Sequence, residues 1–412
     1  MQVLVTGGAG YVGAHVVRAL LRAGHGVVVV DDLSTGHRAF AERNGVPLVQ
    51  GDFGCPELLE QVFALHAPEA IVHVAGKALV AESVDDPAPY FAVNVAAGLR
   101  LLEAARRHGV RRLVFSSTAA VYGVPSQQPI DERCPREPVN PYGASKLAFE
   151  HALAAYAGAY EMRVLALRYF NVAGASAEAD LGELHTPETH LVPNLLRAAR
   201  EGSPFRLYGT NYPTRDGTAE RDFIHVEDLA RAHVQALERL DIIDPLGFGC
   251  ALNLGTGKGV TVREVAAAAE RVLGAGIEVS ERPRRPGDPP RLVADPSLAR
   301  RVIGLHCAHD VDSMIRSAHR FAEAERERGG VEVVEEALKG GDVNRSPRPR
   351  RRFGEVAVQR GYLSPEQVER ALAIQRERDG IGESHKLVGL ILLEMGALSN
   401  EQLIETLRAM QG

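Results

Sequence analysis

The sequence predicts an α/β fold: a doubly wound parallel sheet, a smaller second α/β domain and a C-terminal module that is mostly helical. Short apolar runs alternate with helical patterns through residues 1–171, which is typical of parallel sheets covered on both faces. Residues 172–325 are looser, with long Pro- and Gly-containing loops between helices, and residues 351–412 contain an internal repeat. Such loops suit a domain that closes over a ligand.

The elements of the first domain follow in order. Strands are expected at "QVLVT" (2–6), "VVVVD" (27–31), "AIVHVA" (70–75), "RLVFSS" (112–117) and "RVLALRYF" (163–170), and a helix over 11–23. These continuous apolar runs, bounded by turn signals, suit strands that are buried on both faces. A further helix is expected within "VNPYGASKLAFE" (139–150), where Asn140 can cap and Pro141 fits the first helical position.

Composition indicates an ordinary soluble globular protein of 412 residues, with 45% apolar residues, 24% charged residues and a net charge of −6. No global basic field favours nucleic acid, and no leader or membrane-spanning run is evident. The cysteines show no CxxC spacing and the histidines no HExxH-type clustering. We therefore expect free thiols, a cytoplasmic location and no metal site.

The stretch "VTGGAGYVGAH" follows the first strand and opens the first helix, with Gly7, Gly10 and Gly13 in a GxxGxxG pattern. Glycines there permit a tight turn and close approach of the backbone to a pyrophosphate, which the helix N-terminus attracts. In this strand–turn–helix context the pattern predicts a Rossmann-type dinucleotide site.

Acidic residues at the ends of the next two strands indicate which dinucleotide binds. Asp31 can accept hydrogen bonds from the adenosine ribose and would repel a 2′-phosphate, which favours NAD over NADP. The alternative is that Asp31 is a simple turn residue. Asp52 and Phe53, after the third strand, could bracket adenine.

Tyr142 and Lys146 lie four residues apart, on one face of the expected helix. The spacing alone favours an ordinary surface pair. The upstream glycine loop changes that interpretation, because a phenol and an ammonium beside a nicotinamide cofactor can transfer protons.

Together these residues resemble the extended short-chain dehydrogenase/reductase superfamily, and within it the UDP-glucose 4-epimerase family. The resemblance runs from Met1 to about Phe321 and includes, in family order, "TGGAGYVG", "FSSTAAVYG", "NPYGASK", "RYFNVAGA", "YGTNYPTRDGTAERDFIHVEDLA", "NLGTG" and "RRPGDPPRLVAD". It implies an NAD-dependent enzyme of galactose and other carbohydrate metabolism, a homodimer, that epimerises a UDP-hexose at carbon 4 through a 4-keto intermediate.

The resemblance also implies the site. Tyr142 would be the catalytic acid/base, with Lys146 as its partner and Thr118 as the third member. A free phenol has a pKa near 10, and a neighbouring ammonium with bound NAD⁺ would lower it. The implied NAD contacts are Gly7, Gly10, Tyr11, Val12, Gly13, Asp31, Asp52, Phe53, Ala75, Asn94, Ser116, Tyr142, Lys146 and Tyr169. The implied UDP-sugar contacts are Thr118, Asn171, His190, Leu191, Tyr208, Arg221, Arg285, Asp288 and Leu292.

The residues at several positions limit which reaction and which substrates the enzyme is expected to use. Related dehydratases and decarboxylases carry an acidic residue directly after the threonine, where this chain has Ala119 and Ala120. The family's cofactor lysine is out of register, since Lys77 lies one position early. Leu292 stands where relatives have a bulky Tyr or a small Cys or Ser, which predicts a UDP-glucose/galactose preference with leakage to N-acetyl sugars.

Two alternatives remain open. The chain could be a 4-epimerase of another UDP-sugar, such as an N-acetylhexosamine, a pentose or glucuronate. It could also be a catalytically silent NAD-binding regulatory protein that works through its tail.

Beyond the second domain we expect a charged linker over 326–350, followed by the helical module. The five arginines between Arg345 and Arg352 favour a solvated linker over a nucleic-acid tail. The repeat pairs Ser364 and Gln367 with Ser399 and Gln402, a capping-box pattern in each copy. The module resembles the N-terminal module of type II secretion and pilus ATPases, so it could bind a protein partner, cap an oligomer or bind cyclic di-GMP.

Overall fold

The computed structural model describes residues 1–243, 251–285, 288–329 and 357–380, together with the single positions 392, 395, 397, 399 and 402. The arginine-rich stretch at 345–352 and the predicted free thiol of Cys250 lie outside the described residues. The chain divides into two compact units, Met1–Arg328 and Gly329–Gly412. The first unit contains both predicted domains, and the boundary between them at 171/172 stays a prediction.

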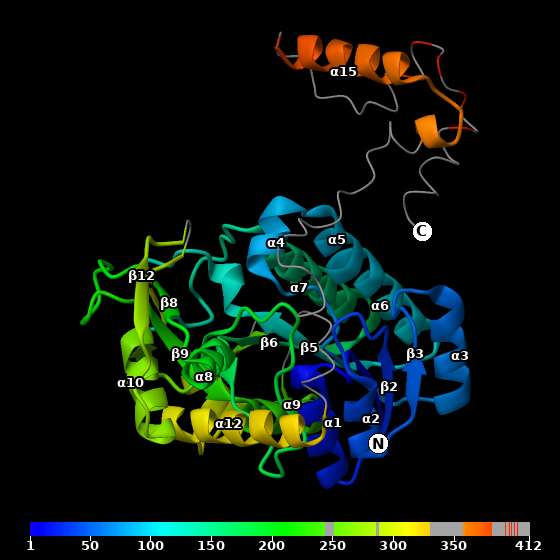
Figure 1. Ribbon diagram of the computed structural model, residues 1–412. Helices are drawn as coiled ribbons and strands as arrows, with labels where there is room; N and C mark the ends of the chain where they lie inside the picture. Colours follow the sequence, from blue (N-terminus) through cyan, green and yellow to red (C-terminus); the bar gives the residue numbers. More distant parts are fainter. Residues whose placement is uncertain are drawn as a thin grey trace. The chain divides into compact units, whose positions relative to one another are not determined.

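A seven-stranded parallel sheet forms the centre of the first unit (Figure 1). Its order is β10-β6-β5-β4-β1-β2-β3. The strands are β1 (Gln2–Thr6), β2 (Gly26–Asp31), β3 (Leu48–Gln50), β4 (Ala70–His73), β5 (Arg112–Thr118), β6 (Arg163–Tyr169) and β10 (Ala251–Leu254). The predicted strands are confirmed, and β10 is a later segment that returns to the sheet. The order reverses between β1 and β4, and ligands bind at the carboxyl ends of strands at such a switch point.

Helices cover both faces of this sheet (Figure 1). One layer contains α1 (Tyr11–Arg22), α2 (Arg38–Asn44), α9 (Val226–Arg239) and α11 (Ser297–Val302). The other contains α3 (Pro56–His66), α4 (Val80–Asp85), α5 (Ala88–Phe91), a π-helical turn (Ala92–Ala97), α6 (Gly98–Arg107) and α7 (Pro141–Tyr160). Because side chains alternate along a strand, Val3 and Val5 enter the core under α1 and α9, whereas Leu4 enters the opposite core.

Two small sheets extend the first unit beside the main sheet (Figure 1). The four-stranded one contains β7 (Asn171–Ala173), β9 (Glu220–His225), β11 (Gly259–Thr261) and β13 (Arg291–Leu292), and the pair contains β8 (Phe205–Tyr208) and β12 (Val279–Arg282). The helices α8 (Leu191–Glu201), α10 (Val262–Leu273) and α12 (Val311–Glu327) pack together and against these strands. None of the helices in the described ranges is long and apolar enough to cross a membrane.

The second unit contains α15 (Pro365–Gly380) and a small core of its own around Ala357, Leu363, Ala371 and Leu392. Ser364 and Gln367 exchange side chain to backbone hydrogen bonds of 2.7 and 3.3 Å. Ser399 and Gln402 do the same at 3.0 and 3.2 Å. Both predicted capping boxes are confirmed.

Candidate active site

The glycine loop between β1 and α1 has no room for side chains at two positions. Gly7 has a φ of +73°, and a Cβ on it would lie 2.6 Å from the backbone nitrogen of Ala75. A Cβ on Gly13 would lie 1.9 Å from the carbonyl oxygen of Gly7. Gly10 caps α1 without a side chain. The result is a cradle lined by backbone at a helix N-terminus, which fits a pyrophosphate.

Asp31, at the end of β2, holds the glycine loop in place through hydrogen bonds. Its carboxylate accepts a hydrogen bond of 2.9 Å from the backbone nitrogen of Ala9 and another of 2.9 Å from that of Leu33. Burial raises the pKa of the Asp31 carboxyl, and these two hydrogen bonds oppose that rise. The bond to Leu33 is the strand-end turn contact that we considered as the alternative, so Asp31 makes a turn and also holds the nucleotide loop.

Only part of the predicted adenine bracket is available. The carboxylate of Asp52 accepts a hydrogen bond from the backbone nitrogen of Gly54. The ring of Phe53 is buried in the core, with its centroid 5.0 Å from that of His73 in an edge contact. The expectation that this ring brackets adenine is therefore wrong, because core packing occupies the aromatic side chain.

The three predicted catalytic residues come from the end of β5 and the start of α7. Asn140 caps α7 as expected, since its side-chain oxygen accepts from the backbone nitrogen of Gly143 at 2.8 Å. The Thr118 hydroxyl lies close enough to the Tyr142 phenol to lower the pKa of that phenol. The Nζ of Lys146 donates to the carbonyl oxygen of Ser116 at 3.1 Å, so the structure gathers these residues where β5 meets α7.

The electrostatics of this group depend on burial. Burial raises the pKa of the Tyr142 phenol, and the nearby Thr118 side chain lowers it. Burial lowers the pKa of Lys146 to about 8, against the opposing charge of Glu150. These side chains alone do not make Tyr142 a base at neutral pH, so the positive charge of a nicotinamide ring would have to contribute.

Asn94 links the catalytic helix to the turn after β4. Its side chain accepts from the backbone nitrogen of Lys77 at 2.8 Å and donates to the hydroxyl of Ser145 at 2.9 Å. The Nζ of Lys77 forms an ion pair of 2.8 Å with Glu82. The out-of-register lysine therefore has a structural partner on α4.

The remaining predicted cofactor contacts lie on the same elements. The hydroxyl of Tyr11 donates to the carbonyl oxygen of Gly174 at 2.6 Å, so it already has a partner within the protein. Burial raises the pKa of the Tyr169 phenol, and the Ser116 side chain opposes that rise.

The predicted substrate residues fall into separate groups. Arg221 on β9 forms an ion pair with Asp288 and lies opposite Leu292 in the β9–β13 register. The guanidinium of Arg285 lies 4.3 Å from the centre of the Tyr208 ring. One face of that ring is occupied, so a uracil could stack only on the other.

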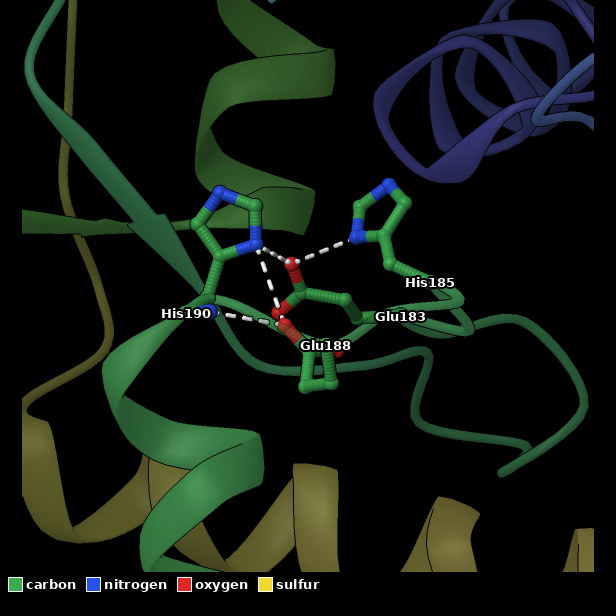
Figure 2. Close-up of side chains that lie close together, drawn as sticks. All are labelled: Glu183, His185, Glu188 and His190. Carbon is green, nitrogen blue, oxygen red and sulfur yellow. Dashed lines mark hydrogen bonds and ion pairs between the residues drawn. The ribbon is translucent and has the colours of Figure 1, made fainter. Parts of the chain in front are cut away.

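The other three predicted substrate positions lie at the ends of two elements. Asn171 begins β7, opposite Phe223 of β9, and Leu191 begins α8. His190 is the N-cap residue of α8, and its Nδ1 lies 2.6 Å from an oxygen of Glu183 and 3.3 Å from one of Glu188 (Figure 2).

One cluster in this loop was not expected from the sequence. Glu183, His185, Glu188 and His190 place ligand atoms within 4.8 Å of one another (Figure 2), and the expectation of no metal site stays a prediction. The available signal was the stretch "GELHTPETH", in which four such residues occupy eight positions without the HExxH spacing.

Sequence reasoning also missed a buried charge network beneath the catalytic strand. Glu150, one helical turn after Lys146, forms an ion pair with Arg168 of β6 at 2.6 Å. Arg168 donates to the Tyr122 hydroxyl at 2.8 Å, which donates to Asn253 at 2.7 Å. The signal was Arg168, which interrupts the apolar run "VLALRYF".

Comparison with known proteins agrees with this geometry. The sequence profile of the NAD dependent epimerase/dehydratase family matches residues 3–255. The chain belongs to this family.

Several relatives within the family are UDP-glucose 4-epimerases. The enzyme of Lacticaseibacillus casei is 44% identical over 325 residues, which are 78% of this chain and 97% of that protein. The crystal structure of the Brucella ovis enzyme in complex with NAD is 45% identical with a TM-score of 0.72, covering 77% of this chain and 97% of that one. The Stenotrophomonas maltophila enzyme, crystallised with NAD and formylated UDP-arabinopyranose, is 38% identical with a TM-score of 0.76, over 80% and 99% of the two chains.

Proposed function

We propose that the chain interconverts UDP-glucose and UDP-galactose by epimerisation at carbon 4, with NAD as its cofactor. The observation that carries this proposal is that Thr118 at the carboxyl end of β5 and Tyr142 and Lys146 at the start of α7 are all buried, with Thr118 close enough to lower the pKa of the Tyr142 phenol and Lys146 bonded to the β5 carbonyl of Ser116. The names of the relatives agree with it.

In this proposal residues 1–171 hold the dinucleotide, with its pyrophosphate on the Gly7–Gly13 loop and its adenosine ribose at Asp31. When bound, NAD⁺ takes a hydride from carbon 4 of the sugar and returns it to the opposite face. Tyr142 removes the proton of the 4-hydroxyl, directly or through Thr118, and later gives it back. Lys146 stabilises the phenolate by its positive charge.

The residues that follow Thr118 limit the reaction to the transfer of hydride and proton at carbon 4. Ala119 and Ala120 begin a 3-10 helix that runs to Tyr122, and Thr118 caps it by accepting from the backbone nitrogen of Ala120 at 3.1 Å. With alanines here, no carboxylate follows the threonine to act on a second carbon, so elimination and decarboxylation are disfavoured.

Substrate selection is assigned to residues 172–325. Arg221 and Arg285 would neutralise the diphosphate through forked hydrogen bonds. Leu292 packs against the cluster of Val121, Tyr122 and Leu147, which would narrow the space beside the sugar. One or two methylene groups in a pocket shift discrimination by about 1–3 kcal/mol, so plain hexoses are preferred and N-acetyl sugars react slowly.

The test is to incubate the purified full chain with a panel of UDP-sugars without added NAD. We expect UDP-glucose and UDP-galactose to interconvert, which also requires that NAD copurifies. The panel includes UDP-arabinopyranose, because the Stenotrophomonas relative was crystallised with a formylated form of that sugar. Equal kcat/KM for UDP-GalNAc and UDP-galactose, or turnover of a UDP-pentose alone, would overturn the substrate assignment.

The cellular setting and the tail are separate proposals. We infer a cytoplasmic homodimer that serves galactose metabolism, with the second unit acting through protein contacts or as an oligomer cap rather than through cyclic di-GMP. The small core of the second unit and its two capping boxes support a folded helical module. Titrating the full chain with cyclic di-GMP tests this: heat at low micromolar ligand that disappears in an Arg352→Ala variant would contradict it.

A further inference from the structure

The loop between β7 and α8 brings four potential metal ligands to one point (Figure 2). The Nδ1 atoms of His185 and His190 lie 3.1 and 2.6 Å from the same oxygen, Oε1 of Glu183. His190 Nδ1 also lies 3.3 Å from Oε1 of Glu188. All four side chains come from eight consecutive positions, so one loop conformation builds the whole cluster.

The two carboxylates are enclosed, and Oε1 of Glu188 also accepts hydrogen bonds of 2.7 Å from the backbone nitrogens of Thr189 and His190. The side chain of Glu183 is 8% exposed and that of Glu188 is 12% exposed. Within the described part of the chain, neither forms an ion pair with a lysine or an arginine; the two histidines are their ion-pair partners. Buried carboxylates need a positive partner, since an unpaired buried charge is costly. A divalent cation held by all four side chains would supply this positive charge in place of protons on the two histidines.

The chemistry of the ligand set selects a class of cation. Imidazole nitrogen with carboxylate oxygen is a typical set for zinc and neighbouring divalent transition metals, whereas calcium and magnesium prefer oxygen alone. Tetrahedral ligands at about 2.0–2.1 Å from a metal lie roughly 3.4 Å apart. Three of the distances between these ligand atoms are 2.6–3.3 Å and all are within 4.8 Å, so modest side-chain shifts would reach that spacing.

We propose that Glu183, His185, Glu188 and His190 form a binding site for one divalent transition metal ion, with zinc as the expected occupant. The ion would fix the loop that leads into α8. A metal on Nδ1 would also fix the tautomer of His190, leaving its proton on Nε2. If His190 contacts the UDP-sugar, which rests on the proposed function, that N–H would be a donor for a diphosphate oxygen.

The first measurement is metal binding by the full, untagged chain. The protein is stripped with a chelator, dialysed, and titrated with zinc by calorimetry, and the metal retained after gel filtration is counted by mass spectrometry. We expect one tightly bound zinc ion per chain. Cobalt(II) substituted for zinc should give the intense visible bands of a four-coordinate site with nitrogen and oxygen ligands.

Variants locate the ion. His185→Ala and Glu183→Gln should each weaken zinc affinity at least tenfold, since even losing an outer partner of a ligand costs about 10–100-fold. Two controls should bind zinc like the wild type: His151→Ala, an exposed histidine of α7, and His309→Ala, from a second His–Glu group with His225. Melting of the stripped proteins by circular dichroism shows whether each variant is folded.

Two outcomes would overturn the proposal. One is a wild-type chain that retains no zinc after gel filtration, which would leave the cluster as a set of ion pairs. The other is zinc affinity that falls in His309→Ala and not in His185→Ala. Zinc stoichiometry does not depend on turnover, so a chain that binds zinc without epimerising any UDP-sugar would refute the proposed function alone.

Discussion

The ion pair between Glu150 and Arg168 makes the stability of the fold sensitive to one isosteric change. Both side chains are almost fully buried, at 5% and 2% exposure. Glu150 accepts two hydrogen bonds from the Arg168 guanidinium, at 2.9 and 2.6 Å, and one from the Ser117 hydroxyl at 2.5 Å. Glu150→Gln preserves the volume but leaves the guanidinium without its counter-charge.

The expected cost follows from this burial. Removing one partner of a buried ion pair costs about 3–5 kcal/mol, because the remaining charge stays desolvated. In a unit of this size each kcal/mol lowers the melting temperature by about 2 °C. Glu150→Gln should therefore melt about 6–10 °C below the wild type.

The assay is thermal unfolding followed by far-ultraviolet circular dichroism, because the chain contains no tryptophan. Cofactor concentration must be fixed, since a bound ligand shifts the midpoint. The matched control is Glu103→Gln, whose partner Arg106 is also on the surface, with exposures of 40% and 39%. It should cost less than about 1 kcal/mol.

A double variant separates charge from shape. Glu150→Leu with Arg168→Leu removes both charges, and such replacements are often close to neutral. It should melt above Glu150→Gln. If Glu150→Gln has the same melting temperature as the Glu103→Gln control, the buried ion pair does not have the expected effect on stability.

Three further predictions concern the loop, the interior and the pocket. Gly13→Ala places a methyl group 1.9 Å from the Gly7 carbonyl oxygen, so it should cost about 1–3 kcal/mol and lose copurified NAD; Gly158→Ala, with open space around it, should retain NAD. Burial lowers the pKa of His233 from 6.5 to about 4, so the unfolded chain binds a proton that the folded chain excludes. Stability should fall as the pH drops from 6.5 to 4, by up to about 3 kcal/mol, and urea midpoints of His233→Gln should lack this part of the pH dependence. Leu292→Ala should raise the kcat/KM ratio of UDP-GalNAc to UDP-galactose about 10-fold or more, and an unchanged ratio would remove Leu292 from the selectivity argument.

The parts of the site that were predictable are those fixed by local chain geometry. The glycine loop follows directly from a strand and opens a helix, so its contacts depend on a few adjacent residues. The Asn140 cap and the pairing of Ser364 with Gln367 are equally local. Thr118 and Tyr142 are distant in sequence, and their meeting followed from the family resemblance rather than from any periodicity.

The parts that were missed depend on tertiary packing. Arg168 lies in an apolar strand, and only the fold shows that it meets Glu150 on the neighbouring helix. From the sequence we expected the ring of Phe53 to be available for adenine, but in the fold it packs against His73. The cluster around Glu183 depends on an irregular loop path, which no helix or strand period encodes.

The proposed function depends most on Tyr142, which exchanges the proton of the sugar hydroxyl. Tyr142→Phe removes only the phenol oxygen, which is the atom that carries this proton. The matched control is Tyr90→Phe, because the Tyr90 ring lies 6.5 Å from that of Tyr142 and its hydroxyl donates to Leu79.

The decisive measurement is single-turnover conversion of UDP-galactose by each variant, alongside its NAD content. We expect Tyr142→Phe to keep its NAD and to lose about 10²–10⁴-fold in rate, while Tyr90→Phe remains active. A Tyr142→Phe enzyme with its NAD and a rate within about 10-fold of the wild type would contradict this role of Tyr142.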